Sequence, residues 1–341
     1  MNSNSIFTRR HAGADAAASV SAPATTSAAA EDAFKNDPTA TLEGVRGKDV
    51  TKAAKALLKD SVKRGGGSIQ MRDVVKIYPG STVHALDDFN LDIKPGEMVA
   101  LIGSSGSGKS TLMRHIAGLM PGDADGGRIE VAQHLIQDRG VISRDIRTMR
   151  AEIGMVFQQF NLVDRMSVLR NVMLGALSRT ALWRSLLGFF HEEDARLAYK
   201  ALARVGIMEK AHQRTSNLSG GQQQRAAIAR ALVQRARVLL ADEPIASLDP
   251  ESSRNVMETL RDLNQKDGLT VLVTLHQVDY ALSFCPRTIA LKHGRVVYDG
   301  PSAELTPAFL KRLYGTECDS LFARQESDIR RNPPLTQVQV A

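Results

Sequence analysis

The sequence is poor in cysteine and lacks long hydrophobic runs. Its 341 residues include two cysteines, Cys285 and Cys318, too few for a disulfide framework and typical of a protein kept reduced in the cytosol. No apolar run approaches the roughly 18 residues of a membrane-spanning helix. The densest apolar cluster, residues 182–190, is interrupted by Arg184 and Gly188. These absences exclude a disulfide-rich secreted domain and argue against a chain that crosses the membrane.

Charge of one sign is also not concentrated anywhere in the chain. Lysine and arginine number 44 against 37 acidic residues, for a net charge of +7, but the two signs are interleaved. We therefore expect a generally basic surface and no nucleic-acid partner. The 43% hydrophobic and 24% charged residues are ordinary for a globular protein with a sizeable core.

The first 66 residues differ in composition from the rest. The stretch from Ala14 to Ala30 is almost wholly Ala, Ser, Thr, Val and Pro, which cannot bury enough surface to offset the entropy of ordering. We predict a disordered extension over residues 1–66, with Gly65–Gly67 as a flexible joint, a folded domain over 67–315, and a flexible tail over 316–341.

Within the folded part, short apolar strands alternate with helical patterns. The strands are expected at Ile69–Tyr78, Val83–Ile93, Glu97–Ile102, Val238–Ala241 and Thr270–Leu275. Between the last two, Val256, Leu260 and Leu263 recur at i, i+4 and i+7, as on a helix. This alternation predicts an α/β sheet with phosphate chemistry at the carboxyl ends of its strands.

The clearest motif is a glycine-rich loop between an apolar strand and a helix. It reads GSSGSGKST and comprises Gly103, Ser104, Ser105, Gly106, Ser107, Gly108, Lys109, Ser110 and Thr111. Glycines let the backbone turn its N–H groups toward phosphates, which favours ATP as the ligand. Lys109 is expected to contact the β- and γ-phosphates, and the Ser110 hydroxyl to ligate Mg²⁺.

A second strand, Val238–Ala241, ends in the carboxylates Asp242 and Glu243. By itself this could be a polar strand end. Downstream of a phosphate-binding loop, Asp242 is expected to hold Mg²⁺ and Glu243 to orient and polarise the attacking water.

A third segment, Ser219–Gly221, opens a further helix and forms a second anion-binding helix start. One nucleotide does not need two such sites, so a head-to-tail dimer would bring this segment to the γ-phosphate held by the partner. The alternative is a plain helix start capped by Ser219.

These motifs, in this order, resemble the nucleotide-binding subunits of ABC transporters over residues 68 to about 314. The resemblance implies a P-loop ABC-type domain with an antiparallel β subdomain and a helical signature subdomain at about 160–235. It further implies roles for seven residues in catalysis, adenine binding or subunit contact. They are the signature residues Ser219, Gly220, Gly221 and Gln222, the D-loop Asp249, the switch His276, and Tyr78, which stacks on adenine. Gln158 is implied as the Q-loop glutamine, beside the catalytic centre and Mg²⁺.

Longer stretches resemble the phosphonate-importer ATPases in particular. They are Phe160–Arg165, Trp183–Leu186, Leu239–Ser253, Thr274–Leu282 and Cys285–Thr288; the segment Gln133–Arg147 and the long N-terminal extension do not match. The resemblance implies a homodimer at the cytoplasmic face of the inner membrane, with permease subunits and an extracytoplasmic phosphonate-binding protein as partners. The alternatives are import of phosphite or another oxyanion, and a soluble ABC ATPase outside transport.

Overall fold

The computed structural model describes residues 65–124, 126–180 and 190–315 of the chain. Three expectations lie outside the described residues: the disordered extension up to residue 64, the tail at 316–341, and the Trp183–Leu186 stretch, which falls within residues 181–189.

A six-stranded sheet occupies the centre of the described structure. Its order is β11-β10-β3-β9-β8-β7, and all neighbours are parallel except β10 and β11. The strands are β3 (Met98–Ile102), β7 (Ile153–Val156), β8 (Val238–Ala241), β9 (Thr270–Thr274), β10 (Arg287–Lys292) and β11 (Arg295–Pro301). The sheet confirms the predicted α/β class and brings the ends of β3, β9 and β8 side by side.

A second, antiparallel sheet packs beside it, in the order β2-β1-β4-β5-β6. Its strands are β1 (Ile69–Ile77), β2 (His84–Ile93), β4 (Arg128–Val131), β5 (His134–Asp138) and β6 (Val141–Ile142). The segment that matched no family pattern, Gln133–Arg147, supplies β5, β6 and the start of α4 (Ile146–Arg150).

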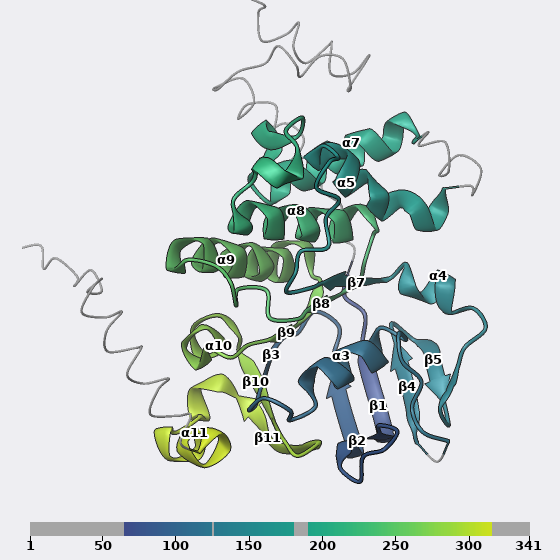
Figure 1. The fold of residues 1–341 in the computed structure, drawn as a ribbon, viewed down its shortest axis with the longest axis vertical. Helices are drawn as coiled ribbons and strands as arrows, with labels where there is room; N and C mark the ends of the chain where they lie inside the picture. The colour runs from purple at the N-terminus through teal and green to yellow at the C-terminus, as the bar shows by residue number, and fades with distance from the viewer. Residues whose placement is uncertain (1–64, 125, 181–189, 316–341) are drawn as a thin grey trace, which may run out of the picture.

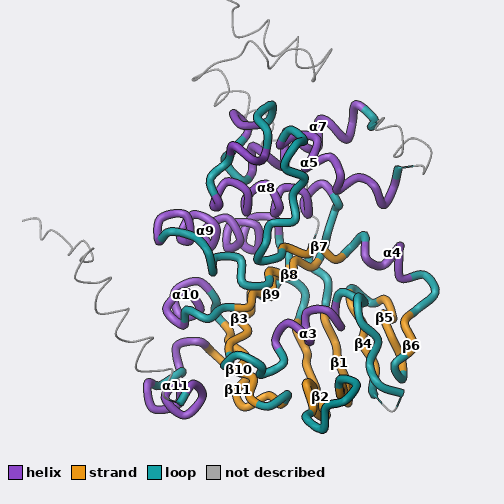
Figure 2. The backbone as a smooth tube through the Cα atoms, in the orientation of Figure 1, coloured by secondary structure: helices purple, strands orange, loops and turns teal. Residues whose placement is uncertain are grey.

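Most of the described helices cover one face of the six-stranded sheet, and a helix together with the antiparallel sheet covers the other (Figures 1 and 2). A group of helices that precedes β8 forms the upper part of Figure 1; it comprises α5 (Val168–Met173), η1 (Leu174–Arg179), α7 (Glu192–Arg204), η2 (Met208–Lys210), η3 (Thr215–Asn217) and α8 (Gly220–Val233). The others are α3 (Lys109–Ile116), α9 (Pro250–Asp267), α10 (Val278–Phe284), η4 (Ser302–Glu304) and α11 (Pro307–Tyr314). No helix among the described residues is both long enough and apolar enough to cross a bilayer.

Strand β3 shows how the core is divided. Met98, Ala100 and Ile102 face the cluster formed with the helices α5, α7, α8 and α9. Val99 and Leu101 face the other cluster, with α3 and the antiparallel sheet. Because alternate side chains of a strand point to opposite faces, a strand covered on both faces is apolar throughout. The glycine-rich loop that follows β3 is therefore attached to a strand held on both sides.

The glycines expected to form a flexible joint are instead packed against the sheet. Gly66 and Gly67 are buried. A Cβ at Gly66 would overlap the Gly96 nitrogen and the Thr270 hydroxyl. The carbonyl oxygen of Gly67 accepts a hydrogen bond from Thr270 Oγ1 at 2.7 Å. The prediction of a flexible joint is wrong at Gly66 and Gly67, because the absence of a side chain lets these residues pack closely against the sheet. Of the three glycines, Gly65 is the exposed one.

Candidate active site

The loop between β3 and α3 is held close to two neighbouring segments by its first and last glycines. Gly103 has a φ of 152° and Gly108 a φ of 107°, which other residues rarely adopt. A Cβ at Gly103 would overlap the carbonyl oxygen of Leu291 on β10, and a Cβ at Gly108 would overlap that of Ala85 on β2. Both positions require glycine, as a backbone that curls around phosphates does.

Lys109, the first residue of α3, lies across this loop. Its side chain is buried. The Nζ atom donates to the carbonyl oxygens of Gly103 at 2.6 Å and Ser104 at 3.1 Å. Between them, Ser105 and Gly106 form the exposed tip of the loop. The arrangement sets an ammonium group and a helix N-terminus at the carboxyl edge of the sheet, where both attract phosphate oxygens.

The start of the loop is also bound by a residue that the sequence analysis missed. The Gly103 N–H donates to the phenolic oxygen of Tyr314 at 3.2 Å, and Tyr314 is buried at the end of α11. No local pattern around Tyr314 could have indicated this contact. It depends on the return of α11 to the sheet.

Two oxygen-bearing side chains meet beside the loop. Ser110 Oγ and Asp242 Oδ1 lie 3.5 Å apart, one from the start of α3 and one from the end of β8. Mg²⁺ prefers such oxygen ligands and is commonly bound by one or two carboxylates together with water and phosphates. The described residues contain no group of three or more His, Cys, Asp or Glu side chains that could hold a metal alone. The donor set therefore fits Mg²⁺ bound jointly with a nucleotide.

Glu243 and His276 form a close pair at the same edge. His276 Nε2 lies 2.6 Å from Glu243 Oε1. The Glu243 side chain is mostly buried, whereas His276 is half exposed. Glu243 has a φ of 50°, in the left-handed region that costs a non-glycine residue about 1–2 kcal/mol. A carboxylate held in a strained backbone conformation, with its orientation set by a neighbour, is an arrangement often found in catalytic centres.

Thr274, the last residue of β9, is a second residue that the sequence analysis missed. It is fully buried. Its Oγ1 donates to Asp242 Oδ1 at 2.8 Å and accepts from the Glu243 N–H at 2.7 Å. A hydroxyl at the carboxyl end of a strand with an apolar middle, two residues before His276, was the signal that could have indicated it.

Gln158 leaves the sheet at this edge without joining the cluster. It follows β7 by two residues, and β7 pairs with β8 so that the Asp242 N–H donates to the Val156 carbonyl at 2.8 Å. Within the described residues, no hydrogen bond links Gln158 to Ser110 or Asp242, and its side chain is exposed. The pairing of β7 with β8 thus places the backbone of Gln158 near Asp242. The predicted contact of Gln158 with Mg²⁺ stays a prediction.

Tyr78 lies beside α3, just after β1. Its hydroxyl is 3.0 Å from Thr111 Oγ1 and 3.5 Å from the sulfur of Met120. The ring is half-buried. This position brings an aromatic ring to the helix that carries Lys109, as an adenine-stacking role requires.

The signature segment forms a capped helix start on the other face of the sheet from α3. Ser219 Oγ accepts from the Gln222 N–H at 3.3 Å, and the Ser219 N–H donates to Gln222 Oε1 at 3.1 Å. This confirms the capping that the sequence analysis considered as the alternative. Helix α8 packs in one core cluster and α3 in the other. Ser219 and Lys109 therefore lie at the starts of helices on opposite faces of the six-stranded sheet.

Helix α9, which the D-loop residue caps, lies directly against the signature segment. Asp249 caps α9 by accepting from the Ser252 N–H at 2.9 Å, and hydrogen bonds from Ser252 lower the pKa of Asp249. A Cβ at Gly221 would come within 2.6 Å of the Ser252 Cβ. The first turns of α8 and α9 are therefore in close contact, which glycine makes possible.

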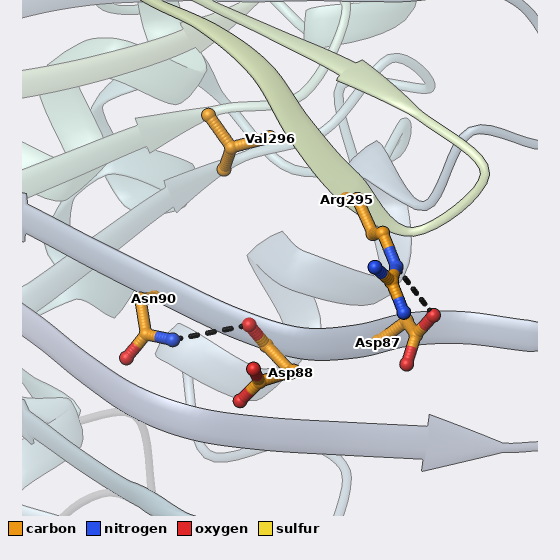
Figure 3. Close-up of a pocket in the computed structure, with 5 residues that line it drawn as sticks. All are labelled: Asp87, Asp88, Asn90, Arg295 and Val296. Atoms are coloured by element: carbon orange, nitrogen blue, oxygen red, sulfur yellow. Dashed lines mark hydrogen bonds and ion pairs between the residues drawn. The ribbon is translucent and has the colours of Figure 1, made fainter.

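A cavity of about 200 Å³ lies apart from these residues, between β2 and β11 (Figure 3). It is lined by Asp87, Asp88, Asn90, Arg295 and Val296. Arg295 pairs with Asp87 at 2.6 Å and lowers the pKa of Asp87. Two carboxylates facing this cavity would repel phosphate, so the cavity is a poorer site for a nucleotide than the loop.

Comparison with known proteins points in the same direction. The family described as ABC transporter matches residues 86–246. The chain is 63% identical over 237 residues to the phosphonates import ATP-binding protein PhnC of Paraburkholderia xenovorans, covering 70% of this chain and 79% of that protein. It is 58% identical over 254 residues to PhnC 2 of Cupriavidus necator, covering 74% and 89%.

Among solved structures, similarity extends to a dimeric cassette. The ATP-binding cassette MJ0796, in a post-hydrolysis state bound to ADP and Pi, superposes with a TM-score of 0.59 at 34% identity, covering 69% of this chain and 98% of that one.

Proposed function

The chain belongs to the ABC transporter family, and we propose that it is the ATP-hydrolysing subunit of an importer that takes up phosphonates. The observation that supports this most directly is the meeting of the glycine-rich loop, the Ser110–Asp242 pair and the Glu243–His276 pair at one edge of one sheet. The names of the relatives then supply the cargo.

The loop residues and Tyr78 would bind ATP. The N–H groups of residues 103–111 and the Lys109 ammonium would receive the phosphates, and the Tyr78 ring would stack on adenine. Ser110, Asp242 and Gln158 would hold Mg²⁺, which when bound neutralises charge on the β- and γ-phosphates. Of these residues, Ser110 and Asp242 already have their side-chain oxygen atoms within 3.5 Å of each other.

Hydrolysis would depend on Glu243. Its carboxylate would accept a hydrogen bond from the attacking water and so orient and polarise it toward the γ-phosphate. His276, 2.6 Å from that carboxylate, would keep it in one orientation. Gln158 would complete the site from the end of β7. The strained backbone at Glu243 is the structural feature that accords with this role.

Each nucleotide would be enclosed between two copies of the chain. Ser219 is exposed at the start of α8, a helix that packs in the other core cluster from α3 and its loop. Residues 219–222 would therefore act on the nucleotide of the partner. Asp249 would carry information between the two sites, since it caps the helix that contacts Gly221. The dimeric state of the similar cassette supports a homodimer.

A mixing experiment tests action in trans. A Lys109→Ala chain and a Ser219→Asp chain are expected to be inactive alone; aspartate keeps the helix cap but brings negative charge toward the phosphate. A mixed dimer contains one site with both lesions and one with neither. Recovery of ATPase activity on mixing is expected, and its absence despite demonstrated mixed dimers would contradict trans action.

The cargo comes from the relatives' names, and the partners from the resemblance to importer ATPases. Permease subunits and an extracytoplasmic binding protein would select phosphonates, and this chain would dock peripherally on the cytoplasmic side of the inner membrane. Reconstitution of the chain with its co-purifying permease and binding protein tests this. Stimulation of ATPase activity by alkylphosphonates is expected. Stimulation by phosphite alone would favour the oxyanion importer, and the absence of any co-purifying permease would favour a soluble ATPase.

A further inference from the structure

The side chain of Thr274 is placed between the two carboxylate residues at the end of β8. We propose that Thr274 is a positioning residue that joins Asp242 and Glu243 into one hydrogen-bonded unit, so that the metal-binding carboxylate and the water-orienting residue keep a fixed geometry. This inference rests on the proposed function, because it needs Asp242 and Glu243 to act on ATP.

The direction of the hydrogen bonds is determined by the groups present. The Glu243 backbone N–H can only donate, so Thr274 Oγ1 accepts from it at 2.7 Å. The single hydroxyl proton is then available to Asp242 Oδ1, 2.8 Å away. That bond is strongest when Asp242 is ionised, the form that also binds Mg²⁺. The chain therefore runs from the Glu243 N–H through Thr274 to the Asp242 carboxylate.

The same hydroxyl stabilises a strained backbone. Glu243 has a φ of 50°, and its N–H would be without this acceptor if residue 274 were apolar. Loss of the acceptor would let the peptide relax toward an ordinary conformation and move the Glu243 carboxylate away from His276. Asp242 would also lose the donor that orients it toward Ser110.

Strand β9 itself provides a matched control. Thr270, at its other end, is equally buried and also makes two hydrogen bonds. Its Oγ1 accepts from the Gly96 N–H at 2.8 Å and donates to the Gly67 carbonyl at 2.7 Å. A Thr270→Val substitution removes the same chemical groups from the same strand without touching either carboxylate.

The experiment compares Thr274→Val, Thr274→Ser and Thr270→Val with the unaltered chain. Valine keeps the shape and removes the hydroxyl, whereas serine keeps the hydroxyl. Three quantities are measured: ATPase kcat and KM, equilibrium binding of a fluorescent non-hydrolysable ATP analogue in Mg²⁺ and in EDTA, and the melting temperature. If Thr274→Val does not fold, Thr274→Ala replaces it.

We expect Thr274→Val to lower kcat about tenfold to a hundredfold. It should also reduce the gain in affinity that Mg²⁺ confers, with affinity in EDTA unchanged. Thr274→Ser should stay within about threefold of the unaltered chain, since it restores both hydrogen bonds. Thr270→Val should lower the melting temperature and leave kcat and the Mg²⁺ gain unchanged.

Three results would overturn the inference: unchanged kcat and Mg²⁺ gain in Thr274→Val, equal losses in Thr274→Ser, or the same losses in Thr270→Val. The first result would mean that the Thr274 hydroxyl has no role in catalysis. Either of the other two would mean that the loss of activity comes from altered packing. If the unaltered chain neither binds nor hydrolyses ATP, it is the proposed function that fails, before any variant is compared.

Discussion

Strand β9 has a buried threonine at each end, and the two lie in very different surroundings. At the carboxyl end, Thr274 contacts Asp242 and the N–H of Glu243. At the amino end, the Thr270 hydroxyl is hydrogen-bonded to backbone groups, those of Gly96 and Gly67. The same residue type, equally buried, thus belongs to a charged cluster at the carboxyl end of the strand and packs against glycines at the amino end.

The difference extends to the whole of each edge. The carboxyl edge contains left-handed backbone at Glu243 and a half-exposed His276. The amino edge is closed by Gly66, whose carbonyl accepts from Arg237 at 3.2 Å, and by the partly exposed Arg237–Glu152 pair. Strain and exposure at one edge accord with catalysis, and close packing at the other accords with stability. Substitutions at the two edges should therefore change different quantities.

The largest effect is expected at Glu243. Glu243→Gln should lower ATP turnover about a thousandfold because the water loses the carboxylate that orients it. ATP affinity should persist, and the nucleotide-bound dimer should accumulate. Steady-state ATPase assays, equilibrium binding and size-exclusion chromatography measure the three. Turnover close to normal would remove Glu243 from the catalytic role.

Gly66 should show the opposite behaviour. Gly66→Val is expected to lower the free energy of unfolding by about 2–3 kcal/mol, because its side chain overlaps Gly96 and Thr270. The kcat of the folded fraction should not change. Gly65→Ala is the control: Gly65 has open space around it and a φ of 69°, so about 1 kcal/mol of strain is expected. Denaturant unfolding measures both, and equal costs would contradict the packing described for Gly66.

Lys109 tests the carboxyl edge through binding. Lys109→Ala removes the cation expected to contact the phosphates and should weaken ATP affinity about tenfold to a hundredfold. Titration with a fluorescent ATP analogue measures the change. Unchanged affinity would show that the loop is not the primary nucleotide site.

The smallest effect is expected from truncation. Removal of residues 1–64 should change the free energy of unfolding by less than about 0.5 kcal/mol, since its composition does not support a core. Extending the deletion through Gly67 removes acceptors for Arg237 and Thr270 and should cost about 1–3 kcal/mol. Equal melting curves for the two truncations would show that Gly66 and Gly67 do not contribute to the amino edge.

Local patterns anticipated much of this structure. The strand expected at Val238–Ala241 has those bounds, and Val256, Leu260 and Leu263 are buried on α9. Such elements follow from periodicity, which is a property of neighbouring residues. The Ser219 cap was equally accessible, because a serine three residues before glutamine forms its bonds within one turn.

Contacts between segments far apart in the chain could not be predicted from local patterns. Gly66 and Gly67 suggested flexibility, because a glycine in a flexible joint and a glycine in a tightly packed site look the same in the sequence. The neighbouring segments of the folded chain make these two positions closely packed. Tyr314 and Gly103 are 211 positions apart in the chain, and no pattern near either indicates the other.

The sequence by itself determined the chemistry of this protein: the loop from Gly103 to Thr111, the carboxylates at 242 and 243, and the family to which their order points. The tertiary structure decided how these groups are held. Thr274 became the link between Asp242 and Glu243 because β9 lies between β3 and β8 in the sheet. Strand order is set by the packing of the whole chain, whereas a motif is set by the spacing of residues along it.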